Sequence, residues 1–323
     1  MTTAPVALFV GATRDPHLSL ARERLEARGL RSCILDPTDP AEVDIRPAPF
    51  EIRLDGDAIE PALVWWRWKE PLFRRADPEI SPLSRSEWRG VAQALRFRFA
   101  DRNVHHPDLL NRAAQKALQL DLAHTLGFKT PETLISSRPD SIRAFVQDLR
   151  IVKSICTPQV FNEDGFTAFD TQRIDAGLIA SLSDDELRST PSLVQARLNK
   201  VAEVRASFVC GALKARKYFP QAALEFDPLV RDDWRAMYRY AQMGLTPSED
   251  VTLPEALAHK INAYAQRSGM RILCFDFAVL ENGVHVFLEA NPDGQWLWLD
   301  DTGALMDAFV AWAERFAKTE SLQ

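Results

Sequence analysis

The residues with the clearest potential for chemistry lie in two apolar segments near the C-terminus. Asp276 lies in RILCFDFAVL, and Glu289 and Asn291 lie in VHVFLEAN. Asn282 and Gly283 stand between the segments, and an Asn-Gly pair favours a two-residue hairpin turn because both turn positions adopt positive φ. In the register set by that turn, Asp276 lies opposite Glu289, and Asn291 shares their face of the hairpin.

Three oxygen-bearing side chains on one face of an apolar hairpin predict a cation site. Two facing carboxylates repel each other, and burying them without a partner destabilises the fold. Hard oxygen ligands without a Cys or His contribution suit Mg²⁺, which commonly connects one or two carboxylates to nucleotide phosphates. Two alternatives stay open at this point: one acid pairs with a lysine or arginine, or a β-bulge breaks the register.

The N-terminal elements predict a β-α-β start. VALFVGA and RSCILD are predicted strands on either side of the helix HLSLARERLEARG, which Gly29 ends. The G-x-G-x-x-G sequence of dinucleotide-binding proteins is absent after the first strand. ALVWWRW (62–68) is a further buried strand.

The middle of the chain alternates helices with strands. NRAAQKALQLDLAHTLG is predicted as one helix that Asn111 caps and Gly127 ends, with a stripe of Leu118, Leu122 and Leu126. The strand candidates are ETLIS, RIVKSI, SLVQARLNK, EVRASFVCG and ALKARKYFP; SIRAFVQDL is a predicted helix, and 156–170 is a loop or irregular hairpin.

The composition is that of an ordinary globular protein. The chain has 323 residues, of which 46% are hydrophobic and 26% charged, and its net charge of −6 argues against a general nucleic-acid binder. Its four cysteines are scattered without metal-ligand spacing, so they are expected to be reduced core residues of a cytosolic protein. With no signal pattern and no apolar run long enough to span a bilayer, a cytoplasmic protein without membrane contact is expected.

Several motifs resemble those of the ATP-grasp ligases. LEANPDGQWLWL is similar to the E-x-N-P-x-G-Q-W form of the microviridin-type, or graspetide, enzymes that modify ribosomal peptides, and an acid on the preceding strand completes the pattern. Weaker similarities lie in NRAAQKALQLDLAHTLGFKTPETL, SLVQARLNKVAEVRASFVCG and VWWRW. The resemblance extends from about residue 60 to the C-terminus. In VWWRW, Trp68 follows Arg67 where the family often has a second arginine, which weakens the transfer of any substrate role to this strand.

The resemblance implies an α/β (α+β) ATP-grasp fold. Its parts would be an N-terminal Rossmann-like pre-ATP-grasp domain over 1–100, a central α/β subdomain over 101–192, and a C-terminal antiparallel-sheet subdomain over 193–323.

The resemblance also implies the cofactors ATP and Mg²⁺ and a set of site residues. Lysines on a helix and on the central strand would contact the nucleotide, a hinge would meet adenine through its backbone, and arginines would clamp phosphates. Carried over, the nucleotide residues are Lys116, Lys153, Gln195, Arg197, Leu198 and Glu203; the catalytic residues are Arg205, Lys153 and Arg216; the metal ligands are Asp276, Glu289 and Asn291. The alternatives are a solvated helix lysine at Lys116, an ordinary edge strand at the hinge, a surface ion pair between Glu203 and Arg205, and a solvent-facing Lys214 and Arg216.

The implied activity is a ligase that activates Asp or Glu side chains of a ribosomal precursor peptide as acyl phosphates. A hydroxyl or amine of the same peptide then forms a side-chain ester or amide ring. A RimK-like or dipeptide-type ligase, and a non-catalytic nucleotide- or peptide-binding module, are the alternatives. The resemblance also implies a homodimer. The leader of the precursor is expected to bind the central subdomain and the irregular region 156–170. Trp296 and Trp298 are expected to pack beneath the site, and the alternative is that they form its wall.

Overall fold

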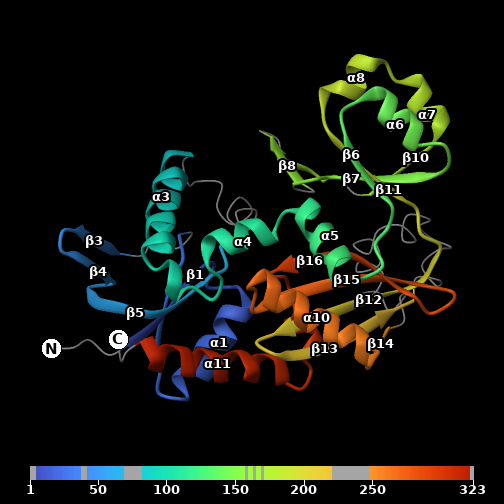
Figure 1. Cartoon of the computed structure of the whole chain (residues 1–323). Helices are drawn as coiled ribbons and strands as arrows, with labels where there is room; N and C mark the ends of the chain where they lie inside the picture. The colour runs from blue at the N-terminus through green and yellow to red at the C-terminus, as the bar shows by residue number, and fades with distance from the viewer. Residues whose placement is uncertain are drawn as a thin grey trace.

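The computed structural model describes residues 5–37, 42–68, 82–156, 159–162, 165–168, 171–219 and 248–320. Within these ranges the chain is a mixed α/β structure with two five-stranded sheets, one four-stranded sheet and a two-stranded hairpin. Figure 1 shows the four-stranded sheet with its helices as a separate lobe at the upper right of the view. No helix in the described ranges is long and apolar enough to cross a membrane.

The N-terminal sheet has the strand order β2-β1-β5-β4-β3 and begins with the predicted β-α-β unit. Strand β1 pairs in parallel with β2 and β5, which confirms that unit, whereas β3 and β4 form an antiparallel hairpin that the sequence analysis missed. The elements are β1 (Pro5–Val10), α1 (Pro16–Glu26), β2 (Arg31–Leu35), β3 (Val43–Pro47), β4 (Phe50–Leu54), β5 (Asp57–Trp66), α3 (Pro82–Arg98) and the 3-10 helix η1 (Ala100–Arg102).

The long helix predicted from Asn111 to Gly127 is two helices. Helix α4 spans Pro107–Ala113 and α5 spans Lys116–Thr125, with a break at Ala114 and Gln115, so Asn111 lies inside α4 instead of capping a helix. The predicted leucine stripe is confirmed only in part. Leu122 and Leu126 are half-buried and pack against the core, whereas Leu118 is 42% exposed. The fully buried residues of α5 are Gln119 and Ala123, and Gln119 accepts a hydrogen bond from β16.

The four-stranded sheet has the order β10-β7-β11-β6 and is antiparallel at every pairing. Three short helices pack on it around a core that includes Ile142, Val146 and Val194. The elements are β6 (Thr133–Ser136), α6 (Pro139–Phe145), β7 (Arg150–Lys153), β10 (Gln172–Ile174), α7 (Ala176–Ser181), α8 (Asp184–Ser189) and β11 (Ser192–Ala196), with the separate hairpin β8 (Gln159–Asn162) and β9 (Gly165–Ala168).

The C-terminal sheet has the order β14-β13-β12-β15-β16 and is antiparallel throughout. Its strands carry most of the predicted site residues. The elements are β12 (Lys200–Val209), β13 (Ala212–Tyr218), β14 (Ser248–Asp250), α10 (Glu255–Ser268), β15 (Ile272–Leu280), β16 (His285–Pro292), the 3-10 helix η4 (Leu297–Leu299) and α11 (Ala304–Glu320).

The hairpin between β15 and β16 contains the predicted pair of Asp276 and Glu289, but its loop length and strand register differ from the prediction. The backbone N–H of Gly283 donates to the carbonyl of Leu280, and the N–H of Leu280 donates to the carbonyl of Val284, so the loop has three residues instead of two. That loop alone would place Asp276 opposite Leu288. A β-bulge after Asp276 leaves Leu288 as the extra residue and restores the pair with Glu289.

The bulge also decides which face of the sheet Glu289 occupies. Phe287 and Ala290 are both fully buried in the core beneath the sheet although they are three residues apart, which a regular strand does not allow. After the bulge, Glu289 and Asn291 therefore lie on the face opposite to this core.

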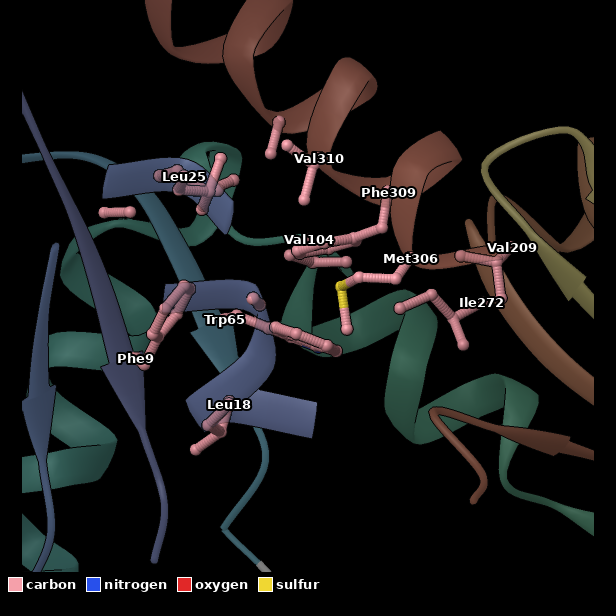
Figure 2. Close-up of a cluster of buried hydrophobic side chains, with 14 of the residues drawn as sticks. Phe9, Leu18, Leu25, Trp65, Val104, Val209, Ile272, Met306, Phe309 and Val310 are labelled. Atoms are coloured by element: carbon pink, nitrogen blue, oxygen red, sulfur yellow. The ribbon is translucent and has the colours of Figure 1, made fainter. Parts of the chain in front are cut away.

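That second face is divided into an apolar end and a charged end. At the apolar end, Val209 and Ile272 pack with Met306 and Phe309 of α11 and with Trp65 of the N-terminal sheet (Figure 2). At the charged end, the cross-strand neighbours are Arg216, Arg205, Asp276 and Glu289 on β13, β12, β15 and β16. Helix α11 thus joins the N-terminal and C-terminal sheets and covers only part of the face that carries the charges.

The cysteines occupy more varied environments than expected. All four are free thiols, but only Cys274 is buried, Cys33 and Cys210 are half-buried, and Cys156 is exposed. The expectation of four core residues was therefore wrong for Cys156, which follows the end of β7.

Candidate functional site

The predicted metal ligands converge on the charged end of the C-terminal sheet. The amide nitrogen of Asn291 donates to Glu289 Oε1 at 2.8 Å and lies 3.4 Å from Asp276 Oδ2, so one donor lies between the two carboxylates. Reversing the amide would turn the Asn291 oxygen toward the same place. Across the described ranges no group of three His, Cys, Asp or Glu side chains could hold a metal ion, so a cation here would use two carboxylates and an amide.

Arg205 lies beside this group as the cross-strand neighbour of Asp276. Its Nη1 donates to both carboxylate oxygens of Asp276, at 2.8 and 2.7 Å, and both side chains are buried. The alternative that one acid pairs with an arginine is therefore realised for Asp276. The surface ion pair between Glu203 and Arg205 is not, because both residues are buried and each has another partner.

The pKa of Asp276 is raised by its surroundings. Burial raises the pKa of Asp276 to about 7, and the nearby charge of Glu289 adds to this increase, although Arg205 acts in the opposite direction. A divalent cation favours the ionised form of its carboxylate ligands. The hard oxygen donors and the elevated pKa together fit a Mg²⁺ ion bound by Asp276, Glu289 and Asn291.

Two further charged groups flank the site. Glu203 is buried and accepts a hydrogen bond from Lys200, which begins β12. Arg216 is the cross-strand neighbour of Arg205 on β13, and it donates to Asp250 at 2.8 Å and to Asp301 at 2.5 Å. The predicted catalytic role of Arg216 would require it to leave or share these carboxylates.

The predicted nucleotide residues lie on the four-stranded sheet and its connections. Lys116, the first residue of α5, donates to the carbonyl of Ser154 at 2.5 Å, next to the predicted Lys153 at the end of β7. Gln195 on β11 is buried and donates to Thr133 Oγ1 at 3.0 Å. Arg197 and Leu198 lie in the connection from β11 to β12, where a hinge between the two sheets is expected.

A second buried charged cluster, which sequence reasoning missed, centres on Arg67. Its guanidinium donates to Asp15 Oδ2 and to Asp293 Oδ1, each at 2.9 Å, and its Nη2 lies 3.3 Å from His17 Nδ1. Trp65 Nε1 donates to the same oxygen of Asp293 at 3.2 Å. The cluster joins β5 and the start of α1 to the turn that follows β16. The only signal in the sequence is an arginine among tryptophans in an apolar strand, VWWRW.

Gln119 is another supporting residue that sequence reasoning missed. Its amide oxygen accepts from the backbone N–H of Ala290, between the predicted ligands Glu289 and Asn291, at 3.2 Å, and its nitrogen donates to the carbonyl of Ala113. Helix α5 therefore supports β16 from the core side. A buried glutamine that satisfies a strand N–H leaves no signal in hydrophobic periodicity.

The two tryptophans after the motif occupy different positions. Trp296 is fully buried and its ring lies against that of His17, with centroids 4.9 Å apart, which agrees with the expected packing role. Trp298 is half-buried, with its ring 6.0 Å from that of Tyr218 on β13.

Solved structures of other proteins superpose on almost the whole chain. An ATP-grasp ligase associated with ribosomal peptide modification from Chryseobacterium gregarium, in complex with ADP and a leader and core peptide, superposes with a TM-score of 0.80 and 16% identity over 97% of each chain. The chain shares its fold with the ATP-grasp ligases. This agrees with the predicted α/β ATP-grasp fold, while the arrangement into a pre-ATP-grasp domain and two subdomains, with boundaries at 100 and 192, remains a prediction.

Two other ligases extend this likeness. The macrocyclase MdnC from Microcystis aeruginosa MRC, bound with the precursor peptide MdnA, superposes with a TM-score of 0.74 and 17% identity, over 97% of this chain and 99% of MdnC. The ATP-grasp ligase PsnB, complexed with a phosphomimetic variant of a minimal precursor, Mg and ADP, gives 0.67 and 19%, over 96% and 99%. Searches against family models and against curated proteins found no match.

Proposed function

We propose that the chain is an ATP-dependent ligase that cross-links side chains of a ribosomal precursor peptide. It activates an Asp or Glu side chain of the peptide as an acyl phosphate, and a hydroxyl or amine of the same peptide then forms an ester or amide ring. The observation that carries this proposal is the group Asp276, Glu289 and Asn291 beside Arg205, on a fold shared with ligases whose complexes hold ADP and precursor peptides.

The chemistry is a phosphoryl transfer followed by an acyl transfer. A carboxylate oxygen of the peptide attacks the γ-phosphorus of ATP and ADP leaves; the nucleophile then attacks the acyl carbon, phosphate leaves and the nucleophile loses a proton. When bound, Mg²⁺ neutralises charge on the nucleotide phosphates. Each linkage therefore removes one water from the peptide.

The residues of this chain supply positioning and positive charge. Arg205 places its guanidinium next to Asp276, where a planar donor group is able to bind phosphate or acyl-phosphate oxygens. We assign Lys116 and Lys153 to the nucleotide phosphates and the segment Gln195–Leu198 to adenine. Arg216 is assigned to the transferred group. No serine or cysteine nucleophile is required in this reaction.

The proposed partner is a precursor peptide with a leader and a core. The leader hypothesis falls on 156–170, of which the structure describes residue 156 and the backbone of the β8–β9 hairpin; the remaining residues lie outside the described ranges. Association into a homodimer remains a prediction, which sedimentation analysis of the purified protein would test.

Mass spectrometry of the peptide encoded beside this gene tests the function. After incubation with ATP and Mg²⁺, we expect the loss of one water for every linkage and one ADP released for each. A gain in mass equal to an amino acid or amine would instead identify a RimK-like or dipeptide-type ligase. An unchanged peptide with nucleotide bound but not hydrolysed would identify a binding module.

A pair of variants in one hairpin tests the assigned site in the same assay. Glu289→Gln should abolish water loss because it removes a carboxylate from the metal site. Glu281→Gln, an exposed position in the loop of the same hairpin, is the matched control and should react like the wild type. Full product formation by Glu289→Gln would exclude the metal assignment.

A further inference from the structure

The turn that follows the predicted metal-binding strand is held by side chains of the N-terminal sheet. Asp293 comes two residues after Asn291 and adopts a left-handed backbone conformation, with φ of 52°. Its carboxylate Oδ1 accepts from both Arg67 and Trp65. The Arg67 side chain is completely buried, and Asp15 accepts from its opposite edge. These bonds attach the turn to β5 and to the start of α1.

His17 holds the next residues of the same turn. Its Nε2 lies 3.2 Å from the backbone N–H groups of both Trp296 and Leu297, which donate to it. Since Nε2 accepts these bonds, the ring proton lies on Nδ1, which faces Asp15 Oδ1 at 2.9 Å. Burial lowers the pKa of His17, which favours this neutral form.

The same turn also contacts Arg205 in the predicted metal site. Arg205 Nη2 lies 3.4 Å from the carbonyl of Gln295, to which it donates. A Cβ atom placed on Gly294 would lie 2.8 Å from the Cβ and Sγ of Cys274 and 3.2 Å from Arg205 Nη2. The turn therefore packs against β15 and against the arginine with no room for a side chain, so the position of the turn constrains the position of Arg205.

We propose that Asp15, His17 and Arg67 form a positioning unit for the magnesium and phosphate site. The unit fixes the turn from Asp293 to Leu297, and through it the placement of Asn291 and Arg205. This inference rests on the proposed function. It gives the arginine of VWWRW a role through Asp293, without contact to the substrate.

Binding of ADP, measured by calorimetry over a range of Mg²⁺ concentrations, tests the unit without the reaction. Asp293→Gly keeps the left-handed backbone conformation but removes the carboxylate that Arg67 and Trp65 hold. Mg²⁺ should increase the affinity for ADP, and the Mg²⁺ concentration that gives half of this increase measures metal binding. We expect this concentration to rise about tenfold in Asp293→Gly, the usual effect of losing an outer-shell partner. ADP affinity without Mg²⁺ should change less, because the segment assigned to adenine does not depend on this turn.

Two variants serve as controls. Asp293→Asn keeps an acceptor oxygen and tolerates positive φ, so its Mg²⁺ dependence should stay close to that of the wild type. Asp307→Asn removes the exposed partner of Arg24, another contact between the N-terminal and C-terminal parts, and should have no effect. If Asp293→Gly does not fold, Trp65→Phe removes the indole donor to Asp293 and keeps an aromatic ring in the core. It should shift the Mg²⁺ dependence in the same direction.

The outcomes separate this inference from the proposed function. An unchanged Mg²⁺ dependence in Asp293→Gly, or in Trp65→Phe if that is the variant that folds, would overturn the positioning unit. A loss of binding-competent protein with unaltered Mg²⁺ dependence would show that the cluster is only structural. If the wild type shows no Mg²⁺-dependent ADP binding, the proposed function itself fails.

Discussion

The molecule contains two buried clusters in which an arginine lies between carboxylates, and their environments differ. One, the N-terminal cluster, consists of Asp15, His17, Arg67 and Asp293; the other, the C-terminal cluster, consists of Arg205, Asp276, Glu289 and Asn291. With His17 neutral, each cluster has one positive and two negative formal charges. The clusters therefore differ in hydrogen-bond donors and not in net charge.

The pKa values of Asp15 and Asp276 show this difference. Burial raises the pKa of Asp15, but hydrogen bonds from His17 and the charge of Arg67 outweigh it, so the pKa lies below its usual value. Burial raises the pKa of Asp276 to about 7, because the opposing effect of Arg205 does not outweigh burial and the nearby charge of Glu289 adds to the increase. A cluster whose carboxylates receive many hydrogen bonds supports the fold, whereas one whose carboxylates receive few is suited to bind a cation.

The largest effect on stability should come from breaking the N-terminal cluster. Arg67→Met would leave Asp15 and Asp293 buried without their shared cation, so we expect a loss of about 3–5 kcal/mol in the free energy of unfolding. Urea denaturation of the ligand-free protein would measure it. A loss below about 1 kcal/mol, as for exposed ion pairs, would remove the distinction between the two clusters.

A substitution in the C-terminal cluster should lower the activity of the protein and leave its stability almost unchanged. Glu289→Gln removes one of two repelling carboxylates, so the free energy of unfolding should change by less than about 1 kcal/mol. Its kcat for peptide cross-linking should fall by about a hundredfold or more, because charge stabilisation in the transition state is lost. A variant that loses stability as Arg67→Met does, but keeps its kcat, would contradict the comparison.

The raised pKa of Asp276 predicts a pH dependence of stability. The folded state holds a proton on Asp276 at pH values where the unfolded state does not, so this group stabilises the fold at low pH. The contribution is lost as pH rises from the ordinary value of 3.8 through about 7. The Tm of Asp276→Asn minus the Tm of the wild type should therefore increase as pH rises from about 5 to about 8. A Tm difference that does not vary with pH would count against the raised pKa.

The smallest effect is expected at the surface contact between α1 and α11. The side chains of Arg24 and Asp307 are 42% and 51% exposed, so Asp307→Asn should lower the free energy of unfolding by less than about 1 kcal/mol. Raising the salt concentration should reduce even this difference, because exposed charges are screened. A larger loss would mean that burial does not separate structural charges from surface ones.

The convergence of Asp276, Glu289 and Asn291 was predictable because strand alternation and a hairpin constrain side-chain positions strongly. The loop length and the bulge were not predictable. The three-residue loop and the bulge at Leu288 each shift the register by one residue, and the two shifts cancel. Local sequence does not distinguish the two cases. The Asn-Gly pair favours a two-residue turn, yet only Gly283 adopts positive φ.

The N-terminal cluster could not be predicted from local patterns. Arg67 and Asp293 are 226 positions apart, and each directly follows a strand of a different sheet. Nothing in the periodicity of either segment indicates that they meet. The same limit applies to the break between α4 and α5, because Gln119 faces β16 through a tertiary hydrogen bond and not through an apolar stripe.

Direct titration with Mn²⁺ tests the central claim that the C-terminal cluster binds the divalent cation of a nucleotide complex. Electron paramagnetic resonance reports free Mn²⁺, so its signal measures how much metal the protein takes up in the presence of ADP. We predict nucleotide-dependent uptake by the wild type and by Glu281→Gln, and its loss in both Asp276→Asn and Glu289→Gln. Equal uptake by all four proteins would contradict the account.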